Sequence, residues 1–341
     1  MINIIVDTLG GDNSPNANVE GAVAALRENE DLKVTFVGDE NAIRAILKET
    51  NAPTERIDVI HAPDEISCND KPTEAIRKKT ESSLYRAIEL LKSGEEYNAF
   101  VSNGSTGAII AGAVLKLGRI KGIKRPALCP LLPTMNKGIV CICDSGANVD
   151  CDEIMLYQFA LMAKLYMEKG YGIENPRVAL LNVGVEEEKG DLLRKAAFKL
   201  ISEDKSINFC GNMEARDLLK GDYDVVVCDG FSGNVLCKST EGACLEMLKL
   251  LKGTLTKNFK TKMGALLLKK DVLGLKDFMD YNNYGGAVLL GCSKTVVKAH
   301  GSSKALAFKH CVEQAYNVEK NNLRNSIDEA IRSNTSVTQE N

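Results

Sequence analysis

The segment NIIVDTLGGDNSPNANVEGAVAALRE, residues 3–28, contains the pattern that decides the fold. Its first residues, Asn3–Val6, are mostly β-branched and are typical of a buried strand. A loop of Gly, Asp, Asn and Pro follows, and Val19, Val23 and Leu26 then recur at helical spacing. The segment therefore predicts one strand–loop–helix unit of an α/β protein.

The same alternation continues along the chain. Short apolar runs predict strands at residues 3–6, 33–37, 57–60, 99–102, 127–132, 138–144, 177–183, 207–210, 224–228, 287–290 and 295–299. Helical periodicity predicts helices at residues 82–93, 152–169, 192–202 and 235–251, and others that begin near residues 16, 40, 106 and 302. Strands that alternate with helices indicate a mostly parallel sheet covered on both faces, so we predict a three-layer α/β/α fold.

Domain organisation follows from the absence of linkers. No Pro/Ser-rich linker and no internal repeat interrupts the chain, so we predict one domain at residues 1–320 with two interwoven lobes. Residues 321–341 are predicted to form a polar tail, and its last residues, NTSVTQEN, are typical of disorder.

Composition excludes several classes of protein. The net charge of −3 and the 5% of aromatic residues, with no Trp, give no basis for binding nucleic acid. The apolar runs are too short to span a bilayer. Eleven cysteines and no signal peptide before Ile2 predict a reducing cytoplasm. Because the chain has no CxxC pair and only His61, His300 and His310, we expect neither a metal nor another cofactor.

Four predicted strands are followed by loops that combine glycine with small polar residues: DTLGGDNSP, SNGSTGA, DSGANVD and DGFSGN. Ligands of α/β sheets bind at the carboxyl ends of the strands, and glycine lets backbone N–H groups approach an anion closely. The four loops therefore predict a phosphate site, although any one of them alone is equally typical of a turn. The candidate phosphate-binding residues in them are Gly10, Gly11, Asp12, Ser105, Thr106, Gly107, Asp229, Ser232 and Gly233. Neither GxxxxGK[ST] nor GxGxxG occurs in these loops, so a nucleotide is not the favoured anion.

Two further loops add charged candidates. VGVEEEKGD, residues 183–191, places Lys189 beside a glycine at the end of a predicted strand, where its ammonium group can meet a phosphate. The preceding acidic run is typical of a solvated surface. HGSS, residues 300–303, joins a strand to a helix, and His300 is either a phosphate ligand or a structural hydrogen-bonding residue.

In series, these loops resemble one family, the bacterial fatty acyl-ACP:phosphate acyltransferases known as PlsX. The resemblance extends from Asn3 to about Val318. The matching motifs are DTLGGDNSP, KP followed by SS, SNGSTGA, RIKGIKRPAL, DSGANVD, NPRVALLNVG, EEKG, INFCGNMEARDLL, DVVVCDGFSGNVLCK, YGGAVLLG and HGSS. Thr8-Leu9, Asn103, Ser105 and Val185 depart from the family pattern, but the spacing is unchanged.

The resemblance implies a function, a fold and partners. The implied reaction moves a long acyl chain from acyl carrier protein to inorganic phosphate, giving acyl phosphate for phospholipid synthesis. The implied fold is similar to that of isopropylmalate dehydrogenase and phosphotransacetylase, in a cytoplasmic homodimer. A membrane acyltransferase that joins acyl phosphate to glycerol 3-phosphate would use the product. The family's catalytic Lys and Asn correspond to Lys189 and Asn234.

Acyl transfer to phosphate requires little covalent chemistry from a protein. Phosphate is itself the nucleophile, so positioning and charge placement dominate. We expect Lys189 and the glycine amides to hold phosphate, and Asn234 to donate a hydrogen bond to the thioester oxygen as it becomes an oxyanion. Asp12 and Asp229 are expected to orient these groups.

Other functions remain open at this point. A short-chain phosphate acyltransferase using coenzyme A would have the same fold. A decarboxylating dehydrogenase would need a metal-binding acidic cluster and a dinucleotide loop, which the sequence does not show. A non-catalytic carrier or scaffold and a cysteine nucleophile at Cys228 or Cys292 are further alternatives, but neither thiol has a credible histidine beside it in the sequence.

Residues 253–280 form a separate basic, amphipathic segment. Its apolar residues recur at helical spacing, and it carries lysines at 257, 260, 262, 269 and 270. One interpretation is a helix packed on the core or on a dimer partner. The other is a projecting hairpin that contacts an anionic leaflet or acyl carrier protein, in keeping with the peripheral membrane association that the resemblance implies. Its predicted contact residues are Leu255, Phe259, Lys260, Met263, Leu266 and Leu267.

Overall fold

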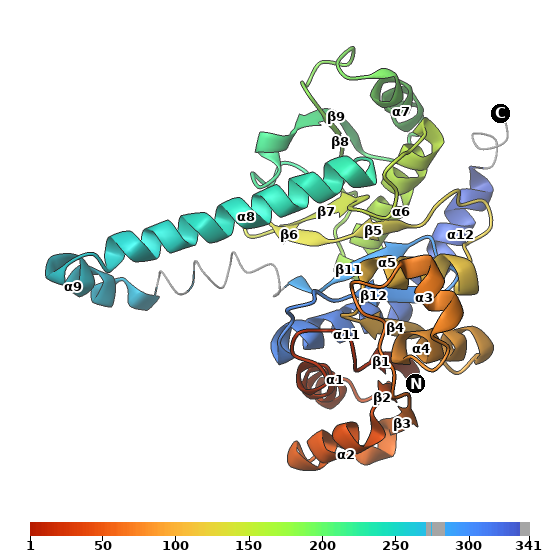
Figure 1. Cartoon of the computed structure of the whole chain (residues 1–341). Helices are drawn as coiled ribbons and strands as arrows, with labels where there is room; N and C mark the ends of the chain where they lie inside the picture. The colour runs from red at the N-terminus through yellow and green to blue at the C-terminus, as the bar shows by residue number, and fades with distance from the viewer. Residues whose placement is uncertain (271–273, 275–283, 335–341) are drawn as a thin grey trace.

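The computed structural model describes residues 1–270, 274 and 284–334, which fold into two α/β lobes and an arm that projects from them (Figure 1). Each lobe is built on its own sheet, of seven and five strands respectively. Among the described residues, no helix combines the length and apolar character needed to cross a membrane.

The first lobe contains the seven-stranded sheet, in the order β3-β2-β1-β4-β12-β11-β5. Its strands are β1 (Ile2–Asp7), β2 (Leu32–Gly38), β3 (Ile57–His61), β4 (Ala99–Ser102), β5 (Ala127–Cys129), β11 (Ala287–Leu290) and β12 (Thr295–Lys298). All neighbours pair in parallel except β11, which is antiparallel to both β12 and β5. The carboxyl ends of β1, β4 and β12 therefore meet at one edge of the sheet.

Helices cover both faces of this sheet. Ile4 and Val6 of β1 pack in the same cluster as residues of α1 (Asn16–Glu28), α2 (Glu40–Glu49) and α11 (Ala305–Lys320). Ile5, between them, packs with α3 (Pro72–Lys78), α4 (Ser83–Ser93) and α5 (Thr106–Gly112) on the other face. Since both faces are buried, a continuous apolar run forms each central strand, as the sequence predicted.

The second lobe contains the five-stranded sheet, in the order β6-β7-β10-β8-β9. Its strands are β6 (Leu131–Pro133), β7 (Ile139–Cys143), β8 (Val178–Asn182), β9 (Phe209–Glu214) and β10 (Val225–Val227). α6 (Glu153–Tyr171) and α7 (Leu192–Glu203) pack on one face, and α8 (Gly230–Leu255) packs on the other through Leu236 and Cys237. Short helical turns occur at Thr54–Arg56, Ala113–Leu117 and Ala215–Asp217.

The chain passes from the first lobe to the second at Pro130. One predicted strand is divided in two at this residue. Residues 127–132 do not form a single strand: Ala127–Cys129 joins the first sheet and Leu131–Pro133 joins the second. Proline has no N–H to continue a ladder of hydrogen bonds, so the strand ends there. After the second lobe is complete, β11 and β12 return to the first sheet.

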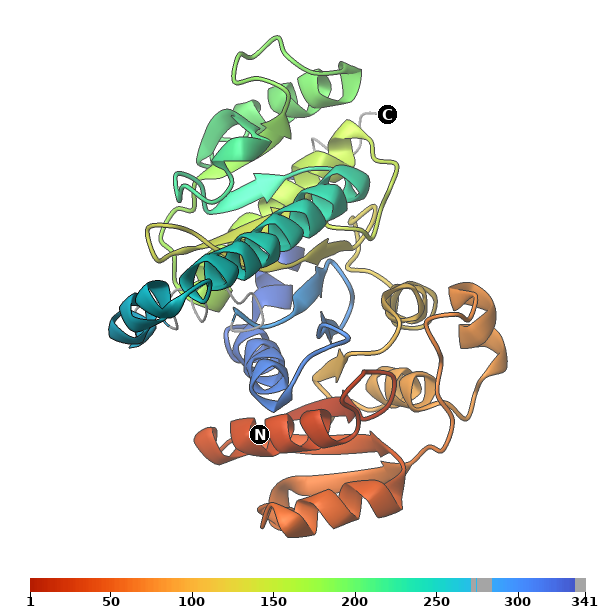
Figure 2. The same ribbon diagram turned by 60° about the vertical axis from the view of Figure 1, so that its left-hand side comes forward.

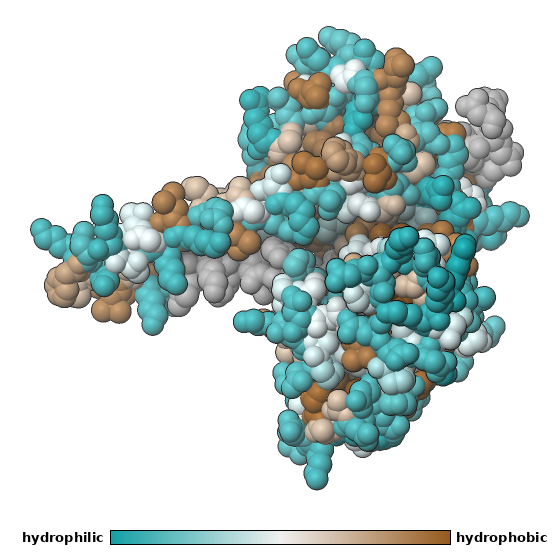
Figure 3. All heavy atoms as spheres, viewed as in Figure 1, coloured by the Kyte–Doolittle hydropathy of each residue, from teal (hydrophilic) through white to brown (hydrophobic). Residues whose placement is uncertain are grey.

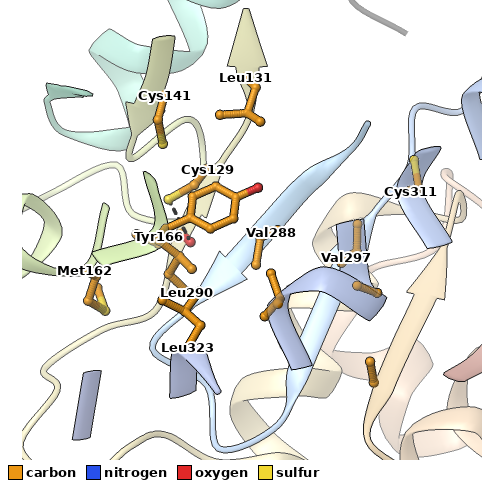
Figure 4. Close-up of a cluster of buried hydrophobic side chains, with 14 of the residues drawn as sticks. Cys129, Leu131, Cys141, Met162, Tyr166, Val288, Leu290, Val297, Cys311 and Leu323 are labelled. Atoms are coloured by element: carbon orange, nitrogen blue, oxygen red, sulfur yellow. Dashed lines mark hydrogen bonds between the residues drawn. The ribbon is translucent and has the colours of Figure 1, made fainter. Parts of the chain in front are cut away.

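The two lobes share one continuous core (Figure 4). Cys129 and Val288 from the first sheet and Cys141 from the second lie in the same buried cluster. Tyr166 of α6 and Leu323 join them there. The lobes are therefore interwoven in sequence and packed as one body.

The first part of the predicted polar tail, which follows Lys320, is helical. Leu323–Ser333 forms the helix α12, whose Leu323, Ile327 and Ile331 are buried in the shared core. These three residues lie four apart and place one apolar stripe on an otherwise polar helix. Residues 335–341 of the tail lie outside the described residues.

The long helix α8 begins earlier and ends later than the predicted 235–251. Only residues at its start are buried, and the rest extends away from both lobes to a loop and the helix α9 (Phe259–Leu267) (Figures 1 and 2). We call residues 239–270 the arm. The basic segment predicted at 253–280 forms its tip as far as Lys270, whereas residues 271–273 and 275–280 lie outside the described residues.

Candidate active site

A cavity of about 550 Å³ lies between the lobes. The loops after β1 and β4 and the end of β12 line it from the first lobe. The segment around Pro130, the loop after β7 and the first turns of α8 line it from the second lobe. All four predicted glycine-rich loops thus contribute to its wall, and the fourth does so through Asn234.

A buried carboxyl group holds the loops after β1 and β4 together. The Ser102 hydroxyl donates to Asp7 Oδ2 (2.7 Å), and the Gly104 amide donates to Ser102 Oγ (3.0 Å). Burial raises the pKa of Asp7 to about 6, although hydrogen bonds from serine side chains oppose this. A Cβ atom on Gly10, whose φ is +94°, would lie 2.9 Å from Gly104 Cα, so the two loops approach as closely as they do because both carry glycine.

An amide network fixes Asn103 beneath these loops. Asn18 Nδ2 donates to Asn103 Oδ1 (2.9 Å) and to the Asp7 carbonyl (2.7 Å). A Cβ atom on Gly11 would overlap Asn103 Nδ2, at 1.9 Å, so Gly11 is required for packing. Ser105 is also buried, at the residue before α5. Gly11 and Ser105 support the cavity wall and do not line it.

A second buried carboxylate, Asp144, shapes the wall on the side of the second lobe. It accepts hydrogen bonds from the amides of Leu128, Ala147 and Asn148 at 2.6–3.2 Å. A Cβ atom on Gly233 would lie 1.9 Å from the Asp144 carbonyl oxygen, so α8 packs directly on this loop. One residue later, Asn234 points its side chain toward Gly146 and lines the cavity.

The loop that carries Lys189 is anchored beside the start of α8. Asn182 Nδ2 donates to the Lys189 carbonyl (3.1 Å), and Asn212 Nδ2 donates to the Glu186 carbonyl (2.8 Å). Arg194 pairs with Asp191 (2.7 Å) and also with Asp229. The Lys189 side chain itself is exposed and is not part of the cavity wall.

Asp229 connects this loop to α8. Its Oδ1 accepts from the Ser232 amide (2.8 Å) and so caps the helix, while Arg194 Nη2 donates to Ser232 Oγ (3.2 Å). Burial alone would raise the pKa of Asp229, but hydrogen bonds from Ser232 and the charge of Arg194 lower it below its ordinary value. Sequence reasoning missed Arg194, whose role becomes visible only when both of its partners are placed in space.

The structure divides the predicted site residues into two groups. Those that line the cavity are Gly10, Asp12, Thr106, Gly107, Asn234 and His300. Those outside the wall are Gly11, Ser105, Asp229, Ser232 and Gly233, which support the loops or the start of α8, and Lys189, whose side chain is exposed.

Two cavity lysines were not predicted. Lys298, the last residue of β12, is partly buried and donates to the carbonyl groups of Asn103 (3.2 Å) and Ala299. Lys238 of α8 pairs with Glu241 (2.8 Å), and both line the cavity. The sequence offered one signal for Lys298: it is a lone lysine that ends an apolar strand directly before the AHGSS loop.

The alternative of a cysteine nucleophile finds no support in the geometry. Cys228 and Cys292 are both buried. Burial raises the pKa of the Cys292 thiol to about 12 and raises that of Cys228 as well. Because the thiolate is the nucleophilic form, neither residue is reactive near neutral pH.

The cavity also has an apolar wall. Ile110 of α5 contributes to it from one side, and Leu128, Leu131 and Leu132 contribute from the segment that crosses between the lobes. Glycine loops, amides and lysines surround the remaining part. An anion and an apolar chain can therefore enter the same cavity.

Known proteins are similar to this chain over nearly its whole length. A family model described as fatty acid synthesis protein matches residues 2–325. A phosphate acyltransferase of Caldanaerobacter subterraneus subsp. tengcongensis is 46% identical over 328 residues, covering 96% of this chain and 97% of the relative. One from Clostridium acetobutylicum is 46% identical over 327 residues, covering 95% and 97%.

Solved structures confirm the predicted fold class. A phosphotransacetylase from Streptococcus pyogenes has a TM-score of 0.60 and 18% identity, covering 93% of this chain and 94% of that chain. At this identity the likeness shows a common fold. The family model and the nearly full-length relatives confirm the resemblance found in the motifs: this chain belongs to the phosphate acyltransferase family, enzymes of fatty acid and phospholipid synthesis.

Proposed function

We propose that this enzyme transfers a long-chain fatty acyl group from acyl carrier protein to inorganic phosphate, releasing acyl phosphate for phospholipid synthesis. The observation that carries the proposal is the two-sided cavity, whose glycine loops suit phosphate and whose Ile110 and Leu131 suit an acyl chain. The names of the relatives, phosphate acyltransferase, support the reaction type.

The chemistry requires one bond to form and one to break. A phosphate oxygen attacks the thioester carbonyl carbon, the carbonyl oxygen becomes an oxyanion, and the C–S bond then breaks to release the carrier thiolate, which takes up a proton from water. Asn234, in the cavity wall, is the proposed donor to the oxyanion. Lys189 is proposed to act from its anchored loop, whose connection through Arg194 fixes it relative to α8.

The second candidate function is short-chain acyl transfer from coenzyme A. The common fold with a phosphotransacetylase favours it. The two candidates differ in the acyl group and the donor, which the fold does not specify.

The arm is the proposed surface for a membrane or carrier protein. Apolar side chains lie both along the arm and at its tip (Figure 3), and they are exposed to between 48% and 83%. They are Leu245, Met247, Leu250, Phe259, Met263, Leu266, Leu267 and Leu268. With the exposed lysines of α9 beside them, they suit reversible attachment to an anionic leaflet, close to a membrane enzyme that consumes acyl phosphate. A homodimer is the other proposed use of this surface.

One assay tests the function. Purified protein is incubated with radiolabelled phosphate and either palmitoyl-acyl carrier protein or acetyl-coenzyme A, and labelled acyl phosphate is separated from free phosphate and counted. We expect product from the acyl carrier protein substrate. Product from acetyl-coenzyme A alone would establish the second candidate, and no product from either would contradict both.

A further inference from the structure

Lys298 carries a partly buried ammonium group at the end of β12. Its side chain donates hydrogen bonds to the backbone carbonyls of Asn103 and Ala299. None of the ion pairs formed within residues 1–270 and 284–334 includes Lys298. Buried ammonium groups are rare without a counter-charge, because their desolvation is costly. The site is therefore suited to a ligand that supplies the negative charge.

The surroundings of Lys298 suit an anion of a particular kind. Lys298 lines the cavity together with Gly10 and Gly104 and with His300 and Gly301. Loops of this composition bring backbone N–H groups close to a small anion with several oxygen atoms. Lysine meets such an anion as a point charge with three rotatable donors.

We propose that Lys298 is the residue whose charge binds inorganic phosphate in the cavity. The inference rests on the proposed function, since it names the phosphate site of that reaction. It gives the phosphate-binding charge to a partly buried lysine of β12, and leaves the exposed Lys189 to act from its loop at the other lobe.

The protonation of Lys298 agrees with this role. Burial, together with the charge of Lys238 on α8, lowers its pKa to about 8, against the opposing effects of Cys311 on α11, Cys68 and Asp7 on β1. The neighbouring His300 ring, whose own pKa burial lowers, faces the same cavity. Lys298 is therefore mostly charged at pH 7 and loses its charge as pH rises past about 8.

The test measures phosphate binding without an acyl donor. Isothermal titration calorimetry with inorganic phosphate at pH 7 is performed on the wild type, Lys298→Met and Lys298→Arg. We expect Lys298→Met to weaken binding at least 30-fold and Lys298→Arg to keep most of the affinity. In steady-state assays of Lys298→Met, the KM for phosphate should rise by a similar factor, while the KM for acyl-acyl carrier protein stays within about twofold.

Lys294→Met is the matched control, because Lys294 precedes the same strand and also donates to a backbone carbonyl, that of Tyr97 (2.9 Å), outside the cavity. It should bind phosphate as the wild type does. Unchanged phosphate affinity in a folded Lys298→Met variant would overturn the inference.

If Lys298→Met fails to fold, the wild type and Lys298→Arg decide the question. The wild-type affinity should fall between pH 7 and 9.5, and that of Lys298→Arg should not. Equal pH profiles would overturn the inference. Phosphate binding through Lys298 in a protein that makes no acyl phosphate would instead contradict the proposed function alone.

Discussion

Asn234 lies where the wall of the cavity meets the packed start of α8. Gly233 fits against the Asp144 carbonyl, and Asn234 then extends into the cavity beside Gly146. Backbone packing on both sides thus fixes the position of this amide before any substrate binds. A donor fixed in this way stabilises developing negative charge without reorganisation.

The first prediction concerns this amide. We expect Asn234→Ala to lower kcat by roughly 10²- to 10³-fold, the range for loss of one oxyanion donor. The KM for phosphate should change little, and thermal unfolding should show a folded protein. A change confined to the KM for phosphate would place Asn234 in ground-state binding instead.

A substitution at the exposed Lys189 can change turnover without changing the stability of the fold. Because its side chain is exposed, Lys189→Ala should leave the melting temperature nearly unchanged while turnover falls by several orders of magnitude. Lys195→Ala, at an exposed lysine of α7, is the matched control and should keep full turnover. Near-normal turnover in Lys189→Ala would remove this residue from the mechanism.

Asp7 should make stability depend on pH. An unfolded aspartate titrates near 4, whereas the pKa of the buried Asp7 is about 6. Between these pH values only the folded protein holds the proton, so the free energy of unfolding falls as pH rises. Measured by urea unfolding, the wild type should lose up to ~3 kcal/mol relative to Asp7→Asn between pH 4 and 7.

The matched control for Asp7 is Asp222→Asn, at an exposed carboxylate in the turn before β10. The difference in free energy of unfolding between the wild type and Asp222→Asn should stay constant between pH 4 and 7. A constant difference between the wild type and Asp7→Asn across this range would mean that Asp7 titrates like an exposed aspartate.

At the scale of elements, α8 serves two regions of the molecule. Its first turns carry Asn234 and Lys238 in the cavity wall, and the same helix extends into the arm, where its apolar residues are exposed. The arm therefore places its exposed apolar surface on the same rigid element as the proposed oxyanion donor. The tip of the arm lies far from the cavity, about 30 Å along α8 from Asn234 to Leu255, so α8 connects a surface contact with the reacting groups at a distance (Figure 1).

Substitutions at the tip of the arm should separate membrane attachment from catalysis. We expect the double variant Leu266→Glu, Leu267→Glu to be released from anionic vesicles, since both side chains are largely exposed on α9. Its turnover with soluble acyl-acyl carrier protein should remain largely intact. Vesicle flotation and the assay for labelled acyl phosphate measure the two properties.

The matched control for the double variant is a leucine outside the arm. Leu115→Glu, at a half-exposed leucine outside the arm, should bind vesicles as the wild type does. Retained vesicle binding by the double variant would contradict the membrane interpretation. Loss of turnover in a folded double variant would favour carrier-protein docking or a dimer contact.

At the scale of the whole molecule, local patterns determined what could be predicted from the sequence. The alternation of strands and helices and the glycine loops lie within short segments, so the fold class and six of the cavity residues were predicted. Lys298 and Arg194 were missed because each acquires its role from partners far away in the sequence: Asn103 for Lys298, and Asp229 for Arg194. The same holds for the break at Pro130, since a change of sheet is a tertiary event.

The order in which the sheets are completed has a consequence for synthesis on the ribosome. β4 ends at Ser102, but its sheet partner β12 begins only at Thr295, roughly 190 residues later. At about 5–20 residues per second, the nascent chain spends on the order of 10–40 s with this edge of β4 unpaired. An unpaired strand edge is a template for pairing with other chains. Chaperone demand during translation should therefore be highest in this interval, and should end when β12, in the last seventh of the chain, emerges.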